Sequence, residues 1–437
     1  MTFMHSFQEA FAGKSITVLG LGLLGRGVGD VEFLAEHGTK LTVTDRKSAD
    51  ELAPSLERLK RFNNITFHLG GHDKNDFVRC DMVLKAAGVP LDSPEIAVAR
   101  EAGVPVVMST ALFAKYASEI GAKIVGVTGT RGKSTIVHMI HHVLTTGGGR
   151  SHLGGNIRGL STLALLPKIK KGDVVILELD SWQLQGFGDL RISPHISVFA
   201  NLMSDHKNYY PDEGSYFNDK ANIFRYQKSK DVLIVSASIA ERVRTAHPPL
   251  DPIIPDAIAR TWKLKILGEH NRENASLAAA ALAALGVSED EIKKGIESFE
   301  PVEGRLQFVR EVNGVRIYND NNATTPEATI AALRALGKNI VLIAGGADKN
   351  LSLNELVSEI KARCKAIHLL SGTGTERINK NLPDARVFDT LKSALAAAFA
   401  TADSGDIILF SPAFASFGMF KNEYDRNDQF LALMHTL

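Results

Sequence analysis

The chain has 437 residues, which is enough for about three domains. Apolar residues make up 44% of the sequence and charged residues 23%, a globular balance that excludes a disordered chain. The 50 Lys and Arg residues nearly cancel the 49 Asp and Glu residues, and a net charge of +1 gives no electrostatic case for a nucleic-acid or membrane-surface partner. Because no apolar run is long enough to span a membrane and the first residues lack a signal peptide's apolar core, we expect a soluble, cytoplasmic protein that acts as a monomer.

In chain order, short apolar segments alternate with helix-favouring ones, a pattern that predicts parallel sheets and an α/β fold. The expected strands cover residues 15–20, 40–45, 123–129, 173–180, 195–202, 339–346, 366–372 and 406–413. Residues 134–144 and 273–285 are expected to be helices because of their apolar spacing and their composition. The elements fall into three blocks, and we expect domain boundaries near residues 113–122 and 303–308.

The first chemical motif is GLGLLG, from Gly20 to Gly25, directly after an expected strand. Glycines at such a turn let the backbone approach a pyrophosphate at the start of a helix. Asp45 closes the next strand, where an acid could accept hydrogen bonds from a nucleotide. The motif favours a nucleoside-diphosphate site over a turn that merely needs small residues, and it leaves open whether the ligand is NAD or another nucleotide.

The second motif is GVTGTRGKST, from Gly126 to Thr135, between an expected strand and an expected helix. The N–H groups of such a loop cradle phosphates, its Lys bridges the terminal phosphates, and its Ser hydroxyl binds Mg²⁺. The spacing departs from the usual phosphate loop, because Val127 stands where the first glycine is expected. The motif nevertheless predicts ATP or GTP binding and is the strongest in the chain.

Oxygen-rich and ionisable residues follow this loop. Glu178 ends a central strand, where a Mg²⁺ ligand is expected, while Asp205 and His206 follow a later strand and Lys220 comes further on. On spacing alone, each of these residues is also compatible with an ordinary solvated loop position.

The order of these motifs resembles the Mur ligase family. The resemblance rests on GVTGTRGKST, then GGN at 154–156, ELDSWQL at 178–184, the Asp205–His206 pair and GEHNRENA at 268–275. Three later segments resemble the branch of the family that adds D-glutamate: EGRLQFV, YNDNNATTPEAT and LFSPAFASFGMFKNEYDR. The resemblance implies an N-terminal Rossmann-like domain over 1–115 that binds a UDP-substrate, a central P-loop domain over 116–305 that binds ATP, and a C-terminal Rossmann-like domain over 306–437 that binds the amino acid.

The resemblance also implies the reaction. ATP phosphorylates the carboxylate of UDP-N-acetylmuramoyl-L-alanine, and the amine of D-glutamate attacks the resulting acyl phosphate in peptidoglycan precursor synthesis. Phosphorylation supplies the leaving group that a free carboxylate lacks, and two Mg²⁺ ions with Lys133 stabilise charge on the transferring phosphoryl group.

Residue by residue, the resemblance assigns ATP contacts, metal ligands and catalytic groups. The ATP contacts are Gly129, Thr130, Gly132, Lys133, Ser134, Thr135, Asn271, Asn274, Arg305 and Asp320. The expected metal ligands are Ser134, Glu178, His206 and Lys220, and the expected catalytic residues are Lys133, Glu178, His206 and Lys220. Lys220 matches a lysine that family members carry as a CO₂-derived carbamate, which replaces a repelling ammonium with anionic oxygens.

Two further sets belong to the substrates. The residues expected at the UDP-substrate are Gly22, Leu23, Leu24, Asp45, Arg46, Ala87, Gly88 and Asn156. The residues expected at the amino acid are Asn322, Thr324, Lys349, Ser416 and Phe417.

Departures from the family pattern keep the amino acid open. Asn322 stands in place of a lysine that would meet the amino-acid carboxylate, and Glu423 replaces a frequent aromatic residue. A Mur-type ligase for a different amino acid is therefore one alternative. An NAD-dependent oxidoreductase is another, although it leaves the phosphate loop, Glu178 and the third domain unexplained. A folylpolyglutamate synthase-like ligase is disfavoured by the N-terminal glycine loop with Asp45, and a ligase-derived binding protein without turnover is disfavoured by the intact catalytic set.

Overall fold

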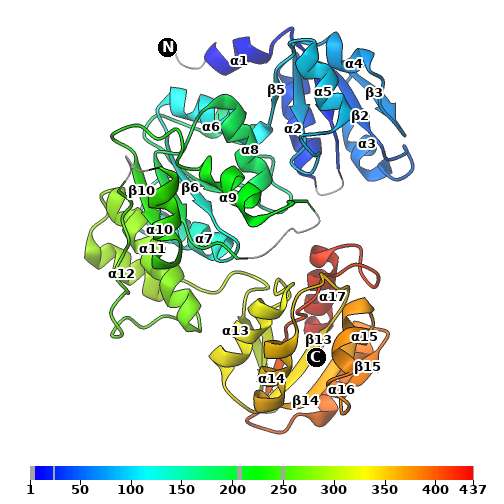
Figure 1. The fold of residues 1–437 in the computed structure, drawn as a ribbon, viewed down its shortest axis with the longest axis vertical. Coiled ribbons are helices and arrows are strands. Elements are labelled where there is room, and N and C mark those ends of the chain that lie inside the picture. Colours follow the sequence, from blue (N-terminus) through cyan, green and yellow to red (C-terminus); the bar gives the residue numbers. More distant parts are fainter. Residues whose placement is uncertain (1–4, 23–24, 204–208, 248–250, 437) are drawn as a thin grey trace. The chain divides into compact units, whose positions relative to one another are not determined.

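The computed structural model describes residues 5–22, 25–203, 209–247 and 251–436. Three β-sheets follow one another along the chain, each accompanied by helices (Figure 1). The chain forms two compact units, residues 1–257 with 274–295 and residues 258–273 with 296–437. The first unit holds the first two sheets and the second unit holds the third. The alternating strands and helices confirm the expected α/β class.

The first sheet has five parallel strands in the order β3-β2-β1-β4-β5. Its strands are β1 (Ser15–Leu19), β2 (Lys40–Asp45), β3 (Ile65–Leu69), β4 (Met82–Lys85) and β5 (Val106–Val107). Its helices are α1 (His5–Phe11), α2 (Arg26–Glu36), α3 (Ala53–Leu59), α4 (Asn75–Val78) and α5 (Pro94–Glu101). The chain winds outward in both directions from β1, so the loops after β1 and β4 separate at a topological switch point, where α/β sheets bind their ligands.

The second sheet is also parallel, in the order β10-β9-β6-β8-β7. Its strands are β6 (Lys123–Thr128), β7 (Ser151–Gly155), β8 (Val174–Glu178), β9 (Ile196–Phe199) and β10 (Val232–Val235). The helices that accompany it are α6 (Ser109–Ile120), α7 (Lys133–Thr146), the 3₁₀ helix η1 (Leu163–Lys168), α8 (Ser181–Leu190), α9 (Glu213–Ala221) and α10 (Ala237–Ala246), with α11 (Glu269–Ala284) and α12 (Glu289–Ser298) later in the chain. The apolar strand β6 is central, and it leads directly into the glycine-rich loop.

The third sheet has six strands in the order β11-β12-β16-β13-β14-β15. Its strands are β11 (Gln307–Val312), β12 (Val315–Asn319), β13 (Ile340–Gly345), β14 (Cys364–Leu370), β15 (Arg386–Phe388) and β16 (Ile407–Phe410). Helices α13 (Pro326–Leu336), α14 (Asn354–Arg363) and α15 (Thr373–Asn379) contribute to the core on one face, and α16 (Leu391–Thr401) and α17 (Glu423–His435) to the core on the other.

One pair in this third sheet is antiparallel, which the expectation of parallel sheets did not include. Strands β11 and β12 form a hairpin at the edge, closed by Asn313 and Gly314, both with positive φ. The Asn-Gly dipeptide between two apolar runs is the strongest short-range hairpin pattern and could have predicted this pair.

One predicted domain boundary falls within a helix, and the other falls in the segment before a strand. Residues 113–122 include most of α6, whereas 303–308 lie in the segment that leads into β11. The domain limits 1–115, 116–305 and 306–437 stay predictions.

Substitution of Gly155 tests whether the close approach of β7 to β8 requires a glycine. Its φ is +86°, and a Cβ there would lie 2.1 Å from the Glu178 carbonyl oxygen. We expect Gly155→Ala to lower the unfolding free energy by about 3 kcal/mol or more, because the backbone strain and the backbone clash add together. Gly148 has a similar φ of +79° and no atom within 4 Å of its Cβ position. Gly148→Ala should therefore cost only about 1–2 kcal/mol in denaturant unfolding. Equal losses in the two variants would contradict this account.

Candidate functional site

The segment between β6 and α7 is a tight glycine-rich turn that ends at the start of a helix, the shape expected of a phosphate-binding loop. Gly129 and Gly132 have φ values of 144° and 84°, which favour glycine. Gly132 is the N-cap of α7, and no side chain in the described part of the chain caps this helix start. A Cβ at Gly132 would lie 2.3 Å from Oδ1 of Asn274, so the loop packs tightly against this predicted ATP contact. A helix start whose first N–H groups are not capped by a side chain attracts phosphate.

Asn201 holds the tip of this loop. Its carbonyl accepts from the N–H of Thr130 at 3.0 Å, and its Oδ1 accepts from the N–H of Arg131 at 2.9 Å. Thr130 is held a second time, because its Oγ1 accepts from the Met203 N–H at 2.9 Å. The sequence argument missed Asn201. A polar residue just after a buried strand that neighbours a phosphate loop is the pattern that could have found it.

Two lysines converge on the same loop carbonyl. Lys133 donates from Nζ to the carbonyls of Gly129 at 3.0 Å and Thr130 at 3.2 Å. Lys220 is only 1% exposed, and its Nζ donates to the Gly129 carbonyl at 3.0 Å and to Thr128 Oγ1 at 3.3 Å. The structure thus brings both predicted catalytic lysines to the root of the loop. Lys220 also faces the Tyr216 ring, 4.8 Å from its centre.

Glu178 ends β8, next to the strand that carries the loop. It pairs in register with Val127 on one side and with Gly155 on the other. Its side chain is 5% exposed, and its carboxylate has no hydrogen-bond or ion-pair partner among the described residues. An unpaired buried carboxylate is suited to receive a cation. The fourth predicted metal ligand, His206, lies outside the described residues together with Asp205.

Helices α8 and α9 are tied together beside these residues. Asp180 caps α8 by accepting the Gln183 N–H at 2.7 Å, which accounts for an acid at this position. The carboxylate of Asp219 accepts from Gln185 Nε2 at 2.8 Å and from the Tyr210 hydroxyl at 2.9 Å. These bonds fix the helix that carries Lys220.

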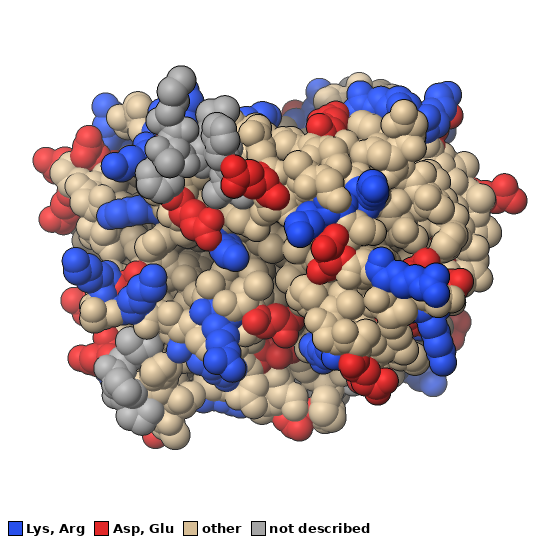
Figure 2. All heavy atoms as spheres, turned by 90° about the horizontal axis from the view of Figure 1, so that it is seen from above, with Lys and Arg blue, Asp and Glu red and all other residues tan. Residues whose placement is uncertain are grey.

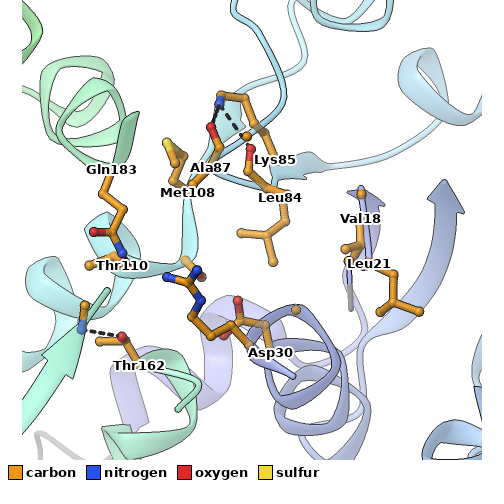
Figure 3. A pocket seen from close by; sticks show the side chains of 18 of the residues that line it. Val18, Leu21, Asp30, Leu84, Lys85, Ala87, Met108, Thr110, Thr162 and Gln183 are labelled. Atoms are coloured by element: carbon orange, nitrogen blue, oxygen red, sulfur yellow. Dashed lines mark hydrogen bonds between the residues drawn. The ribbon is translucent and has the colours of Figure 1, made fainter. Parts of the chain in front are cut away.

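A cavity of about 250 Å³ opens at the switch point of the first sheet (Figure 3). Its walls are the loops after β1 and β4, the start of α2, and residues of the second sheet's part of the same unit, among them Thr110, Gly155, Thr162 and Gln183. Gly20 has a φ of +89°, and its Cβ position lies 3.1 Å from the Ala86 Cβ, so glycine lets the two loops meet. The cavity contains Gly22, Ala87 and Gly88 of the predicted UDP-substrate set.

Two other residues of that set, Asn156 and Asp45, are bonded to residues that line this cavity. The Asn156 N–H donates to the Glu178 carbonyl at 2.8 Å, so it links the cavity wall Gly155 to the end of β8. Asp45 uses its carboxylate on the N–H groups of Leu21 at 2.9 Å and Gly22 at 3.3 Å, and so fixes the glycine turn. The exposed Arg46 is paired with Glu95 at 3.4 Å. Leu23 and Leu24 lie outside the described residues.

Arg26 and Asp30 were not anticipated from the sequence, and they form one wall of the cavity. Arg26 donates to Asn156 Oδ1, and the buried carboxylate of Asp30 accepts from the Ser161 hydroxyl at 2.6 Å. Figure 3 shows Asp30 among the residues that line the cavity. Burial raises the pKa of Asp30 to about 6, against the opposing effects of its serine hydrogen bonds and the Arg26 charge. An acid four residues after an arginine on a helix is a pattern that could have indicated the pair.

In the second unit, three loops meet at the carboxyl ends of the adjacent strands β12, β16 and β13. Ala413 donates to the Ala323 carbonyl at 2.8 Å, and Ala347 and Ala415 exchange hydrogen bonds of 2.9 and 3.1 Å. Lys349 donates from Nζ to Thr324 Oγ1 at 3.3 Å. These links bring the predicted amino-acid residues Asn322, Thr324, Lys349 and Ser416 to one edge of the sheet. Phe417 follows Ser416 but is 65% exposed.

Arg426 anchors two of these loops. Its side chain is 0% exposed and donates to Asn321 Oδ1 and the Asn321 carbonyl, each at 2.8 Å, and to the Phe414 carbonyl at 3.2 Å. Burial lowers the pKa of Arg426 to about 10. Asn322 donates to the Glu303 carbonyl at 3.3 Å, and Glu423 is the first residue of α17, where the helix dipole favours an acid.

The remaining predicted ATP contacts of the second unit have local partners. Asn271 Nδ2 donates to the Leu267 carbonyl at 2.8 Å. Asp320 accepts from the Leu306 N–H at 3.0 Å and from the Ser411 hydroxyl at 2.7 Å. Asp320 thereby fixes the backbone next to Arg305.

The surface offers no single large charged area on the face drawn in Figure 2, where Lys and Arg side chains are interspersed with Asp and Glu. Within the described ranges, every helix is too short or too polar to cross a membrane.

Three family models match the chain. They describe the MurD-like N-terminal domain of Mur ligases over residues 14–108, the Mur ligase middle domain over 127–248, and the Mur ligase glutamate ligase domain over 304–414. The UDP-N-acetylmuramoylalanine–D-glutamate ligase of Roseiflexus sp. (strain RS-1) is 36% identical, with 97% of this chain and 99% of that protein covered. The same-named enzyme of Borreliella afzelii (strain PKo) is 34% identical over 96% of this chain and 97% of that protein.

Solved structures show the same fold at low identity. The UDP-N-acetylmuramate-alanine ligase MurC of Thermotoga maritima matches with a TM-score of 0.63 at 17% identity, covering 97% of this chain and 99% of that chain. The MurF ligase of Thermotoga maritima in complex with ADP matches with a TM-score of 0.58 at 15% identity, covering 90% and 94% of the two chains.

Asp30 gives a pH-dependent prediction. Its pKa is raised from 3.8 to about 6, so between these values the folded state binds more protons than the unfolded state, and the unfolding free energy falls as the pH rises. The ionised carboxylate then costs up to about 3 kcal/mol above pH 6. We expect Asp30→Asn to abolish this slope in thermal unfolding from pH 4 to 7.5 and to be at least as stable as the wild type at pH 7.5. Asp50→Asn, at an exposed site, should keep the wild-type slope. The idea fails if Asp30→Asn keeps the slope.

Proposed function

The chain belongs to the Mur ligase family, and from that premise we propose that it is an ATP-dependent ligase. It joins D-glutamate to the carboxyl group of UDP-N-acetylmuramoyl-L-alanine, a step of peptidoglycan precursor synthesis. The observation that carries the proposal is the 36% identity, over nearly both whole lengths, to a relative named for this reaction. That match extends through all three sheets, including the C-terminal one that holds the predicted amino-acid residues.

In the first unit, the cavity lies close to the glycine-rich loop, which supports transfer of a phosphoryl group from ATP to a substrate in the cavity. The cavity wall Gly155 pairs with Glu178, and Glu178 pairs with Val127 at the root of the phosphate loop. A carboxylate delivered from the cavity therefore has a short path across three neighbouring strands to the terminal phosphate of ATP. Positioning of this kind supplies much of the catalysis of phosphoryl transfer.

We infer two steps. A carboxylate oxygen of the nucleotide-linked L-alanine attacks the γ-phosphorus of ATP, the bond to ADP breaks, and an acyl phosphate forms. The amine of D-glutamate then attacks the acyl carbon, inorganic phosphate leaves, and the nitrogen loses a proton. Lys133 balances the charge on the phosphoryl oxygens in the first step, and the N–H groups at the start of α7 hold the nucleotide phosphates.

Two Mg²⁺ ions fit the residues around the loop. The unpaired, buried carboxylate of Glu178 and the hydroxyl of Ser134 at the start of α7 are the described protein ligands we propose. Among the described residues, no three of His, Cys, Asp and Glu gather as an all-protein metal site. Mg²⁺ takes few protein carboxylates and completes its shell with phosphate oxygens and water. Bound Mg²⁺ would draw negative charge from the transferring phosphoryl group. His206 stays a predicted ligand.

We propose that Lys220 acts as a carbamate. The described contacts of its Nζ are to oxygen acceptors at the loop and to the Tyr216 ring, so the unmodified ammonium would oppose a cation bound to Glu178 and Ser134. Addition of CO₂ to the neutral amine forms an N–C bond, releases a proton and yields anionic oxygens at the same position.

For the amino acid, D-glutamate remains our proposal despite the missing lysine at Asn322. Lys349 supplies a cation beside Thr324, and Ser416 is buried at the same edge. Arg426 does not substitute for the missing lysine, because its guanidinium is already bonded to Asn321 and Phe414. Loss of one charge-assisted hydrogen bond is worth about 1.5–3 kcal/mol, which weakens affinity without abolishing the reaction.

The oxidoreductase alternative loses its support. Family membership over the whole chain disfavours an NAD-dependent oxidoreductase, and the carboxylate of Asp45 is bonded to the glycine turn itself.

We place the enzyme in the cytoplasm, where ATP and nucleotide-activated sugars are found, and propose that it acts as a monomer.

Substrate dependence tests the function. With Mg²⁺, ATP and UDP-N-acetylmuramoyl-L-alanine, phosphate release should require an amino acid, with D-glutamate preferred over L-glutamate in a panel of acceptors. Lys133→Ala should lower kcat on the order of 10²-fold or more, because it removes one electrostatic contact to the transferring group. The matched control is Lys123→Ala. Lys123 is exposed at the start of β6, the strand that leads into the loop, and this variant should keep wild-type rates. If D-glutamate is inert and another amino acid is added efficiently, the proposed acceptor is wrong. If Lys133→Ala keeps full activity, the proposed role of the loop is wrong.

Lys220 has a separate test. We expect Lys220→Ala to be nearly inactive and to regain part of its activity with acetate, which returns an anionic oxygen ligand to the site. Removal of CO₂ and bicarbonate should slow the wild type, while leaving the acetate-rescued variant unchanged. Full activity of Lys220→Ala without additives would refute the carbamate.

A further inference from the structure

Lys85 is a buried lysine at the carboxyl end of β4 that the ligase chemistry does not use. Its side chain is 2% exposed and reaches the cavity at the switch point. Its Nζ donates to three carbonyls of the following loop, those of Ala86 at 3.2 Å, Ala87 at 3.3 Å and Val89 at 2.7 Å. Figure 3 shows the side of this loop that lines the cavity, with the hydrogen bonds from Lys85 to Ala86 and Ala87 as dashed lines. An ammonium group has three donors, so all of them are directed at one short loop.

This arrangement sets the orientation of the loop's peptide groups. With the carbonyls directed at Lys85, the N–H groups of Ala87 and Gly88 have no hydrogen-bond partner in the described part of the chain. Both residues line the cavity. Successive N–H groups left open to a cavity form a concave site for an anion, because their partial positive charges add.

A lysine that only filled space would be an unfavourable choice here. Burial lowers the pKa of Lys85 to about 8 despite the nearby carboxylates of Asp189, Asp180 and Asp219, while the Arg100 charge acts in the same direction as burial. A methionine would fill the same volume without the cost of desolvating a charge. The charged group therefore contributes something that packing does not, and its three carbonyl partners show what it holds.

We propose that Lys85 is a positioning residue for the nucleotide-sugar substrate: it holds the 86–89 loop so that the N–H groups of Ala87 and Gly88 bind a diphosphate oxygen. The inference rests on the proposed function, since it takes the substrate to be a nucleoside-diphosphate sugar. Lys85 itself touches neither the reacting carboxylate nor ATP in this arrangement. Its effect belongs to substrate affinity.

The first test separates KM from kcat. Lys85→Met removes the charge and keeps the length of the side chain. We expect its KM for UDP-N-acetylmuramoyl-L-alanine to rise about tenfold or more, with kcat and the KM for ATP within about twofold of the wild type. Lys40→Met changes an exposed lysine at the start of β2 in the same sheet and should leave all three constants unchanged.

The second test uses the wild type alone. Because only the ammonium form offers three donors, the KM for the nucleotide-sugar should rise as the pH passes about 8, approaching about tenfold per pH unit, and Lys85→Met should lose this dependence. Unfolding does not explain such a rise. The folded-state pKa is below the usual 10.5, so between these values the unfolded state binds more protons and the contribution of Lys85 to stability increases with pH.

A third measurement covers the case in which Lys85→Met folds poorly. Lys85→Ala leaves space beside the loop, and ethylammonium should lower its KM for the nucleotide-sugar. Tetramethylammonium carries the same charge without N–H donors and should not rescue. The role of Lys85 would be refuted, with the proposed function intact, by any of three results in an active wild-type enzyme. These are an unchanged KM in Lys85→Met, a wild-type KM that does not change with pH, and equal rescue of Lys85→Ala by both cations. Absence of turnover by the wild type with this substrate would overturn the proposed function and this inference with it.

Discussion

A loop whose N–H groups face a phosphate has to direct its carbonyl groups elsewhere, and in this protein lysine side chains donate hydrogen bonds to those carbonyls. Lys133 and Lys220 both donate to the Gly129 carbonyl in the central loop. Lys85 collects three carbonyls of the 86–89 loop. Without such donors, carbonyl oxygens would face the ligand's negative charge, and each unpaired one would cost free energy on burial. The ligand-binding surfaces of the first unit depend on this pairing.

The sheets decide where these loops lie. The winding from β1 to β2 and to β4 separates two loops at one edge of the first sheet, and the order β6-β8-β7 places Glu178 between the phosphate loop and the cavity wall. Two glycines permit the close approach. At Gly155 a Cβ would meet the Glu178 carbonyl, and at Gly132 it would meet Asn274. The positions of Glu178, the glycine-rich loop and the cavity wall therefore follow from strand order, and Gly132 and Gly155 stand where a Cβ would come too close to its neighbours.

The sequence was sufficient for the parts of this arrangement that are local. Lys133 follows an apolar strand and Glu178 ends one, and the motif spacing singled out both as candidates that the structure brings to neighbouring strands. The partners that act across the fold were harder to find, because Asn201 follows β9 and holds a loop 70 residues earlier in the chain, and Asp30 meets a serine 131 residues away. Lys85 was not singled out from the sequence, because nothing in the spacing shows where its three donors point. The hairpin closed by Asn313 and Gly314 was a different case, since its dipeptide was present and its significance was not used.

The same device recurs in the second unit with a different cation. Arg426 is as buried as Lys85, and its guanidinium joins the loops after β12 and β16 through carbonyl and amide oxygens. For both cations burial lowers the pKa, so both reduce the stability of the fold relative to an apolar residue of similar size. A guanidinium keeps its charge at a lowered pKa of about 10, whereas an amine at about 8 begins to lose it near neutral pH. The cation that holds the loops after β12 and β16 therefore keeps its charge near pH 8, where the cation that holds the 86–89 loop begins to lose its charge. Lysine at position 85 therefore makes nucleotide-sugar binding sensitive to a rise in pH.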